Sequence, residues 1–193
     1  TSARDKCAVT FTVHNENNEI LMRDNHDMQK AQELFYLPVK SGEYHMQMFT
    51  HAGCKNKPFE FGLTQISGNF EEETNNKSST ATFINELKYV TGYLQQQQSY
   101  GKDVDYYKIN IAEKSSLKLV FEHENFDEKE WFIVELFDDN NKKLLDEKSL
   151  LNKKGITKSI DLDKGEYFVK ISTFQASTKV RGKKYRLAYA LSK

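Results

Sequence analysis

Histidine and cysteine are the residues of this chain best suited to acid–base, nucleophilic or metal chemistry. Five histidines are present, at spacings that suggest no shared metal ion, so we expect strand or surface positions for His14, His26, His45, His51 and His123. Cys54 follows His51 by three residues, but a cysteine nucleophile and its base also need a third group that orients the base. The pair has no such group, and we expect no catalytic site there.

Sequence motifs that place a nucleophile, a metal or a phosphate are also missing. His-Glu-x-x-His, Gly-x-Ser-x-Gly, the P-loop and Gly-x-Gly-x-x-Gly do not occur. The sequence therefore predicts a protein without catalytic activity.

The chain contains two cysteines, Cys7 and Cys54, too few for a zinc cluster or a disulfide framework. Two alternatives stay open, a single disulfide or two free buried thiols.

The composition excludes two kinds of partner. Lys and Arg total 28, as do Asp and Glu, so the net charge is zero and the basic surface of a nucleic-acid-binding protein is missing. The longest apolar run, Trp131 to Phe137, contains Glu135 and is far shorter than the roughly 20 residues of a membrane-spanning helix. We expect neither a nucleic-acid partner nor a membrane span. Because residue 1 is Thr rather than Met, we expect a processed product or part of a longer chain.

An internal repeat organises the elements of the chain. Residues 9–18 match residues 132–141, and residues 41–44 match residues 164–167, with one offset of 123 residues. No insertion therefore separates the two landmarks in either copy. Each copy reads as a strand, an Asn-Asn turn, a polar stretch, and a Gly-Glu-Tyr turn into another strand.

Alternation of apolar and polar residues with a period of two predicts the strands. The inward-facing sets are Tyr44, Met46 and Met48; Phe59, Phe61 and Leu63; Tyr107, Ile109 and Ile111; Leu117, Leu119 and Phe121; Tyr167, Val169 and Ile171; and Tyr185, Leu187, Tyr189 and Leu191. About seven short strands in residues 69–193, with turn signals between them, indicate an all-β, antiparallel β-sandwich. One helical candidate is Ser78 to Glu86.

The two copies differ in completeness. Residues 69–193 contain a whole sandwich, whereas residues 1–68 contain only its back half. A half-sandwich exposes an apolar face and unpaired strand edges, both of which native proteins avoid. We therefore expect an upstream segment, a partner chain or the second copy to cover residues 1–68.

Five stretches follow one another between residues 69 and 193: Glu71-Glu-Glu-Thr-Asn-Asn76, Tyr89-Val-Thr-Gly-Tyr-Leu94, Asp103-Val-Asp-Tyr-Tyr-Lys-Ile109, Val134-Glu-Leu-Phe-Asp-Asp-Asn-Asn141 and Asp163-Lys-Gly-Glu-Tyr-Phe-Val169. Their order resembles the bacterial pre-peptidase C-terminal domain family, which includes the collagen-binding domains of clostridial collagenases. The resemblance implies a jelly-roll-like sandwich that follows the catalytic unit of a secreted protease. Residues 9–65 resemble only the back half of that domain.

The resemblance also implies a calcium site. In the collagen-binding members a Glu-x-Glu-x-Asn-Asn segment joins a later Asp-x-Asp loop to hold calcium, and the matching positions here are Glu71, Glu73, Asn75, Asn76, Asp103 and Asp105. Calcium takes six to eight oxygen ligands of these kinds. The alternative is that residues 71–79 are a polar linker between domains whose charges face water.

Together these features predict a non-catalytic accessory or binding module of a secreted protein, which docks to an extracellular protein target or to its parent protease domain. Aromatic side chains in the outward register are the candidate protein contacts: Tyr106, Phe168 and Phe174. A second layer or the neighbouring copy could equally cover them. The alternative function is a structural or adhesive repeat region of a cell-surface protein, in which calcium stiffens the joint at residues 69–76.

Overall fold

The computed structural model describes residues 7–27, 37, 39, 41–50, 54, 60–94, 103–124, 131–150, 153–173 and 184–193. Within these ranges the regular elements are β-strands and short 3-10 turns, among them η3 (Ser78–Thr80). The predicted all-β class is confirmed. A helix long and apolar enough to span a membrane is not found in the described ranges.

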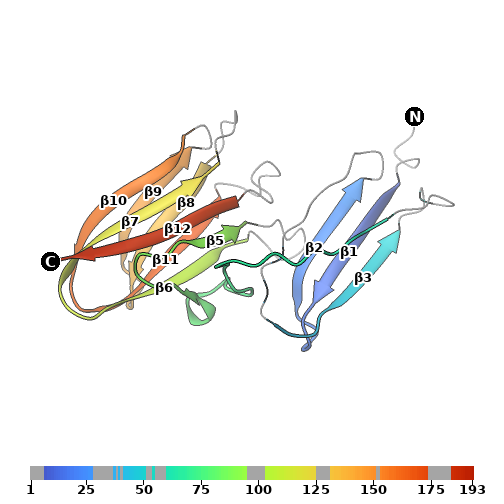
Figure 1. Ribbon diagram of the computed structural model, residues 1–193, viewed down its shortest axis with the longest axis horizontal. Helices are drawn as coiled ribbons and strands as arrows, with labels where there is room; N and C mark the ends of the chain where they lie inside the picture. The colour runs from blue at the N-terminus through green and yellow to red at the C-terminus, as the bar shows by residue number, and fades with distance from the viewer. Residues whose placement is uncertain are drawn as a thin grey trace.

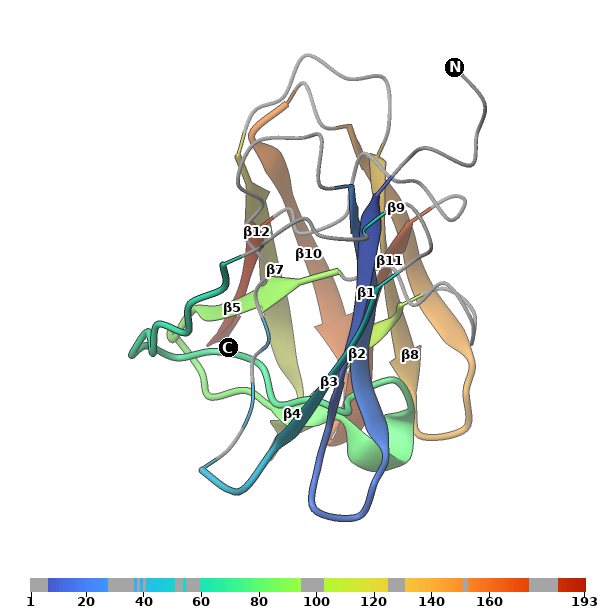
Figure 2. The same cartoon turned by 90° about the vertical axis from the view of Figure 1, so that its right-hand side faces the viewer.

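The strands form three sheets, and the first lies beside the other two (Figures 1 and 2). It has the order β2-β1-β3, with β1 (Ala8–His14) between β2 (Ile20–Asp27) and β3 (His45–Thr50). Both pairings are antiparallel.

The other two sheets have the orders β10-β7-β12-β5 and β4-β6-β11-β8-β9. Their strands are β4 (Thr82–Phe83), β5 (Val90–Tyr93), β6 (Asp105–Ile111), β7 (Ser115–His123), β8 (Trp131–Asp138), β9 (Lys143–Leu150), β10 (Gly155–Leu162), β11 (Gly165–Thr173) and β12 (Lys184–Ser192). All their neighbours are antiparallel, as predicted, except β4 and β6, which are parallel.

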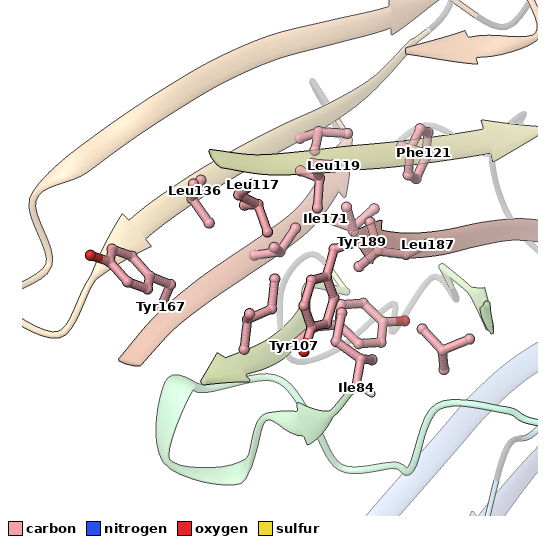
Figure 3. Packing of buried hydrophobic residues seen from close by; sticks show 14 of the residues in the cluster. Ile84, Tyr107, Leu117, Leu119, Phe121, Leu136, Tyr167, Ile171, Leu187 and Tyr189 are labelled. Atoms are coloured by element: carbon pink, nitrogen blue, oxygen red, sulfur yellow. The ribbon is translucent and has the colours of Figure 1, made fainter. Parts of the chain in front are cut away.

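The inward faces of these two sheets share one hydrophobic core (Figure 3). Leu117, Leu119 and Phe121 of β7 contribute to it from one sheet, and Leu136 and Ile171 contribute from the other. All five side chains are buried, as their period-two spacing predicts. The core therefore makes the two sheets a sandwich.

Two sequence-based interpretations need correction. The helical candidate Ser78 to Glu86 contains only η3 and then β4, because Thr82 and Ile84 are buried while Phe83 is exposed, which is strand alternation. The polar stretch between the Asn-Asn turn and the Gly-Glu-Tyr turn of the second copy forms β9 and β10. Both lie at sheet edges, where charged side chains can reach water, and this obscured their pattern.

The pairing of the first sheet recurs 123 residues later in the five-stranded sheet. Strands β9, β8 and β11 have the same order as β2, β1 and β3. Equivalent residues have equivalent partners: Val13 pairs with Met22 and Met46, and Leu136 pairs with Leu145 and Val169. The register shifts directly after Val13 in one case and directly after Leu136 in the other.

The Asn-Asn turns recur in the same detail. Asn18 and Asn141 both adopt a positive φ, 59° and 60°, which asparagine tolerates better than most residues. Their backbone N–H groups donate to the carbonyl oxygens of Asn15 and Asp138 respectively, at 3.0 and 3.1 Å. The two turns and the strands beside them thus share backbone conformation and register.

The predicted closing strand of the first copy is not formed. Phe59 lies outside the described residues, and residues 60–69 carry no strand. Phe61 and Leu63 are 62% and 81% exposed. The corresponding strand of the sandwich, β12, pairs with β7 and β5, and the described residues give the first sheet no equivalent of either.

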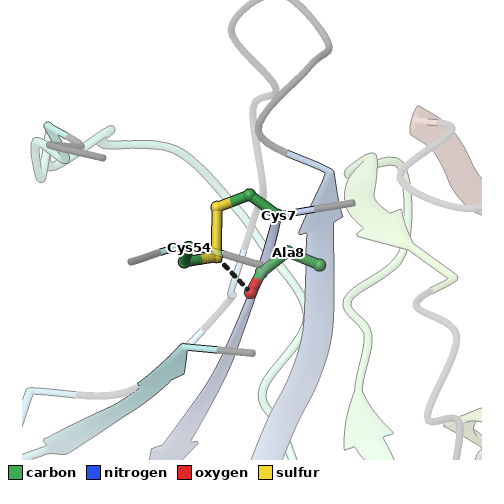
Figure 4. Close-up of a disulfide and its surroundings, with 3 residues drawn as sticks. All are labelled: Cys7, Ala8 and Cys54. Atoms are coloured by element: carbon green, nitrogen blue, oxygen red, sulfur yellow. Dashed lines mark hydrogen bonds between the residues drawn. A yellow bond between two sulfur atoms is a disulfide. The ribbon is translucent and has the colours of Figure 1, made fainter. Parts of the chain in front are cut away.

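Cys7 and Cys54 form a disulfide that joins the start of β1 to the segment after β3 (Figure 4). Both cysteines are buried, and Sγ of Cys54 lies 3.2 Å from the carbonyl oxygen of Ala8. Of the two alternatives left open by the sequence, the structure has the disulfide.

Candidate metal centre

The segment that leads into the sandwich is fixed alongside β5. Phe70 forms a parallel bridge with Thr91, the N–H of Glu71 donates to the Thr91 carbonyl at 2.9 Å, and the Thr91 N–H donates to the Asn69 carbonyl at 2.8 Å. Because successive residues of an extended chain point to opposite sides, this pairing directs the Glu71 side chain into the protein. Glu71 is only 2% exposed.

Strand β6 brings a second carboxylate to the same place. Asp105 is its first residue, and Asp105 and Tyr107 lie on its inward face, both fully buried. The N–H of Tyr106 donates to the carbonyl of Asn75 at 2.9 Å, which ties the start of β6 to the entering segment.

Three carboxylates meet at this junction. One oxygen each of Glu71, Glu73 and Asp105 lie within 4.8 Å of one another, and no other such group of three ligand residues occurs in the described ranges. Oxygens at these separations can bind one cation together. The structure therefore contains a buried acidic triad, defined as Glu71, Glu73 and Asp105, that can hold a metal ion.

Hydrogen bonds hold the Glu71 carboxylate in place. Its Oε1 accepts from the N–H of Tyr93 at 2.7 Å. Its Oε2 accepts from the Tyr107 hydroxyl at 2.6 Å and from Nδ2 of Asn75 at 3.2 Å, and it lies 3.1 Å from the Tyr185 hydroxyl. Hydrogen bonds to a carboxylate favour its charged form, so they oppose the effect of burial on Glu71 and fix the orientation of its carboxyl group.

The two tyrosines link the triad to the core. The Tyr185 hydroxyl donates to Oδ2 of Asp105, and the hydroxyls of Tyr107 and Tyr185 lie 2.7 Å apart. Gly92 gives them room, because a Cβ at that position would overlap the Tyr185 ring and the Tyr107 hydroxyl. The glycine is therefore required for this arrangement of the tyrosines.

Two buried oxygens at the site accept no hydrogen bond. Oδ1 of Asn75 and Oδ1 of Asp105 are fully buried and have no hydrogen-bond partner within the described part of the chain. A buried polar atom without a partner costs about 1–3 kcal/mol, and more when it is charged. Both atoms are of the type that calcium accepts as ligands, so the donor set fits a hard cation.

Burial raises the pKa of each carboxyl group of the triad, and repulsion between charges adds to the shift at Glu73 and Asp105. For Glu71 and Asp105 burial is the largest cause, and repulsion by Glu71, Asp103 and Glu73 adds to it at Asp105. Burial also raises the pKa of Glu73 well above its usual value, with Asp103 and Glu71 contributing repulsion. A cation at the triad would reverse these shifts, because it favours the charged form of every carboxylate around it.

The other predicted ligands lie around the triad. Asn75 is fully buried and bonded to Glu71. Oδ1 of Asn76 accepts from the N–H of Val104 at 3.3 Å and is used to position the loop before β6. Asp103 is buried and acts on the triad through its charge. The structure therefore brings Glu71, Glu73, Asn75 and Asp105 together, and places Asn76 and Asp103 at their margin.

The water-facing linker predicted as the alternative for residues 71–79 is wrong for the first part of that segment. Glu71 and Asn75 are buried, whereas Glu72 and residues 77–79 are exposed. The buried residues are those with hydrogen bonds to the sandwich, since their side chains point inward from the paired segment.

Sequence reasoning assigned Tyr107 and Tyr185 to the core and missed their contacts with the triad. A signal existed for Tyr107, because it follows Asp105 by two residues on the same strand and must share its face. Nothing in the local sequence connects Tyr185 or Gly92 with the acidic residues, because β12 and β5 reach them only through the fold.

Two of the candidate contact residues lie on the outer face of the five-stranded sheet. Tyr106 and Phe168 are half-buried, in register with Lys170 and Phe137 respectively. Phe174 lies outside the described residues.

The residues considered for acid–base chemistry have structural partners. Nε2 of His123 lies 2.9 Å from the Ser149 hydroxyl, and its Nδ1 lies 2.7 Å from the carbonyl oxygen of Glu124. Burial lowers the pKa of His123, so the neutral ring is favoured. Cys54 is held in the disulfide and has no thiolate to offer as a nucleophile. His51 lies outside the described residues.

No protein-family model and no curated protein matches the chain. Solved structures do match it. A protein from Sulfurospirillum deleyianum matches 55% of this chain and 98% of its own at 14% identity, with a TM-score of 0.34. The chain is also similar, over 60% of its length and with 14% identity and a TM-score of 0.44, to 99% of the pre-peptidase C-terminal domain of a collagenase from Bacillus anthracis.

Proposed function

We propose that residues 69–193 form a calcium-binding, non-catalytic accessory module of a secreted protein. The observation that carries the proposal is the buried acidic triad, in which three carboxylates come within 4.8 Å of one another. Without a cation they must repel one another or take up protons. With calcium they become ligands.

The chemistry of the donors favours calcium over softer metals. The triad offers carboxylate oxygens, Asn75 adds an amide oxygen with no hydrogen-bond partner in the described ranges, and the described residues place no histidine or cysteine beside them. Hard cations prefer such oxygen ligands, whereas zinc and copper favour nitrogen and sulfur. Glu71, Glu73, Asn75 and Asp105 are the residues that would hold the ion.

The accessory role rests on what surrounds this site. The order of motifs from Glu71 to Val169 resembles that of pre-peptidase C-terminal domains, and those domains have a jelly-roll-like sandwich in secreted proteases. The module would dock to an extracellular protein target or to its parent protease domain, with Tyr106, Phe168 and Phe174 as the contact residues to test.

Calorimetry and thermal melting of the whole chain, with calcium and with chelator, test the metal site. Saturating calcium should raise the free energy of unfolding of the sandwich by about 2–3 kcal/mol at a hundredfold excess over Kd. Glu73→Gln and Asp105→Asn should each abolish most of the calorimetric signal, because each removes one charged ligand while keeping the side-chain volume.

Glu72→Gln is the matched control, since Glu72 neighbours Glu73 in sequence but is exposed. It should bind calcium like the unmodified chain. If calcium leaves the melting of the unmodified chain unchanged, or if all three variants respond alike, the proposed site is wrong.

A second function is favoured by the recurrence of strand register 123 residues apart. Matching order, bulge and turn conformation in two places suggest tandem copies, and repeated modules are typical of structural or adhesive surface proteins. The full reading frame separates the two functions: a catalytic domain encoded with this region supports the accessory module, and further copies of the repeat support the adhesive region.

A further inference from the structure

Strand β3 ends the first sheet, and the described residues supply no strand on its outer edge. Its equivalent 123 residues later, β11, pairs on that side with β6. The consequence is visible in burial: Val169 and Ile171 of β11 are completely buried, whereas their equivalents Met46 and Met48 are partly exposed, Met48 by 36%. Among the described residues, the edge of β3 therefore lacks a partner that its counterpart has.

One face of the first sheet has the character of a sandwich interior. The pairings place Val13, Met22 and Met46 together on this face, followed by Phe11, Asp24 and Met48. Val13, Met22 and Asp24 are buried, so the exposed part of the face lies along β3, where Met46 is half-buried and Met48 is 36% exposed. The opposite face is more polar, although it includes Phe49: its other members are Thr10, Thr12, Arg23, Asn25 and Gln47. A mainly apolar face is typical of a sheet that packs against a second layer.

Residues 60–68, further along the chain from β3, expose their large apolar side chains. Residues 60–68 run without regular structure, and Phe61, Leu63 and Ile66 are 62%, 81% and 56% exposed. The equivalent segment of the sandwich is paired with other strands. Its closing strand, β12, is held by β7 along most of its length, and β7 also holds β10. The described part of the chain provides no strand equivalent to β7 beside residues 60–68.

We propose that the first sheet is an acceptor for two consecutive strands of another polypeptide segment, equivalent to β6 and β7. The first would add antiparallel to the outer edge of β3, and the second would pair with residues 60–68 and cover the exposed part of the apolar face along β3. The register of β6 on β11 fixes the expected alignment: Tyr107 is opposite Val169 and Ile109 opposite Tyr167, so apolar donor residues should face Met46 and Tyr44.

A second copy of this chain does not fit the same surface. Its own β6 and β7 are paired on both edges within its sandwich and are not available as donors. Two first sheets packed face to face would hide the apolar side but leave the edge of β3 and residues 60–68 without hydrogen bonds. The occupant is thus a separate segment with alternating apolar residues, in the manner of β-strand addition.

A graft within the full chain tests this. Placing a copy of residues 69–123 directly before Thr1 keeps the 123-residue spacing and supplies strands of the required pattern. Amide hydrogen exchange at β3 and residues 60–68, measured in chelator so that calcium plays no part, should slow by at least about tenfold relative to the chain without the graft. Amide exchange in the strands of the original sandwich, measured on the same sample, shows that the protein is folded.

Neighbouring residues of β3 provide the matched variants. Met48 shares the apolar face, whereas Phe49 points to the opposite side. In the grafted chain Met48→Lys should remove the added protection and Phe49→Lys should keep it. The proposal is overturned if grafting leaves amide exchange unchanged, or if both variants have equal effects. It is also overturned if β3 is already protected in the chain without the graft and sedimentation shows that this chain self-associates.

Discussion

The hydroxyl of Tyr185, on the last strand, donates a hydrogen bond to the carboxylate of Asp105, at the start of β6, although 80 residues separate them. The same hydroxyl reaches Glu71, so one tyrosine bridges two members of the acidic triad. The hydroxyl and both carboxylates are buried, so removing the hydroxyl leaves buried carboxylate oxygens without this partner.

Tyr185→Phe should therefore lower the free energy of unfolding by about 1–3 kcal/mol, because it leaves a buried carboxylate without a donor. Calcium affinity should fall as well, since Asp105 is no longer oriented. Tyr189→Phe, on the same strand, is the control, because Tyr189 lies near Glu86 and not near the triad. Denaturant titration with and without calcium measures both effects, and equal losses for the two variants would contradict the bridging role.

Gly92→Ala should disturb the tyrosines directly. The added Cβ overlaps the Tyr185 ring and the Tyr107 hydroxyl, and forcing atoms into a packed core typically costs about 1–3 kcal/mol. Gly62→Ala is the matched change, because a Cβ there meets nothing within 4 Å. It should alter stability by less than about 0.5 kcal/mol in the same denaturant titration. A neutral Gly92→Ala would show that the tyrosines can move without cost.

The stability of the metal-free sandwich should decrease as pH rises. The pKa values of Asp105 and Glu73 are raised well above their usual values by burial and repulsion, so the folded state binds protons that the unfolded state has already released. Their stabilising contribution is complete below the unfolded carboxyl pKa of about 4 and is lost as pH rises through the folded pKa.

Glu135 works in the opposite direction, because Lys143 and Lys170 lower its pKa and its contribution is lost as pH falls. The triad is isolated by comparing the unmodified chain with Asp105→Asn in thermal melts in chelator. The variant should show a weaker fall in melting temperature towards high pH, and saturating calcium should remove most of the fall in the unmodified chain. If Asp105→Asn has the same pH dependence of melting temperature as the unmodified chain, the triad is not the cause of the fall.

The disulfide should stabilise the first sheet and not the sandwich. Its cysteines are 47 residues apart, and closing a loop of that size is typically worth about 2–4 kcal/mol. Replacing both Cys7 and Cys54 by serine should speed amide exchange in β1 by about a hundredfold or more while β7 stays unchanged. Equal acceleration in both strands would mean that the two parts unfold together.

The sequence predicted the elements whose pattern is local. Alternation in residues such as Leu117, Leu119 and Phe121 was sufficient for strand β7, and the 123-residue repeat anticipated the matching turns at Asn18 and Asn141. Edge strands β9 and β10 were not predicted, because their charged side chains face water on at least one side and weaken the alternation pattern. Their strand conformation depends on pairing with β8 and β7 rather than on their own composition.

The candidate site was only partly predictable for a related reason. The acidic residues could be named from their order along the chain, and Tyr107 could have been added from its spacing to Asp105. The contribution of Tyr185 depends on β12 crossing from the other sheet, and that of Gly92 on the close approach of β5. Such relationships are set by packing between sheets, which residue spacing along one strand does not contain.

The exposed stretch at residues 60–68 has a practical meaning for the handling of the protein. Proteases cut most readily in exposed segments without regular structure, and this stretch has both properties, with Phe61 and Leu63 accessible to solvent. A cut there would detach the sandwich together with its acidic triad. Resistance to limited digestion at these residues would then report, in any preparation, whether the first sheet has received its missing strands.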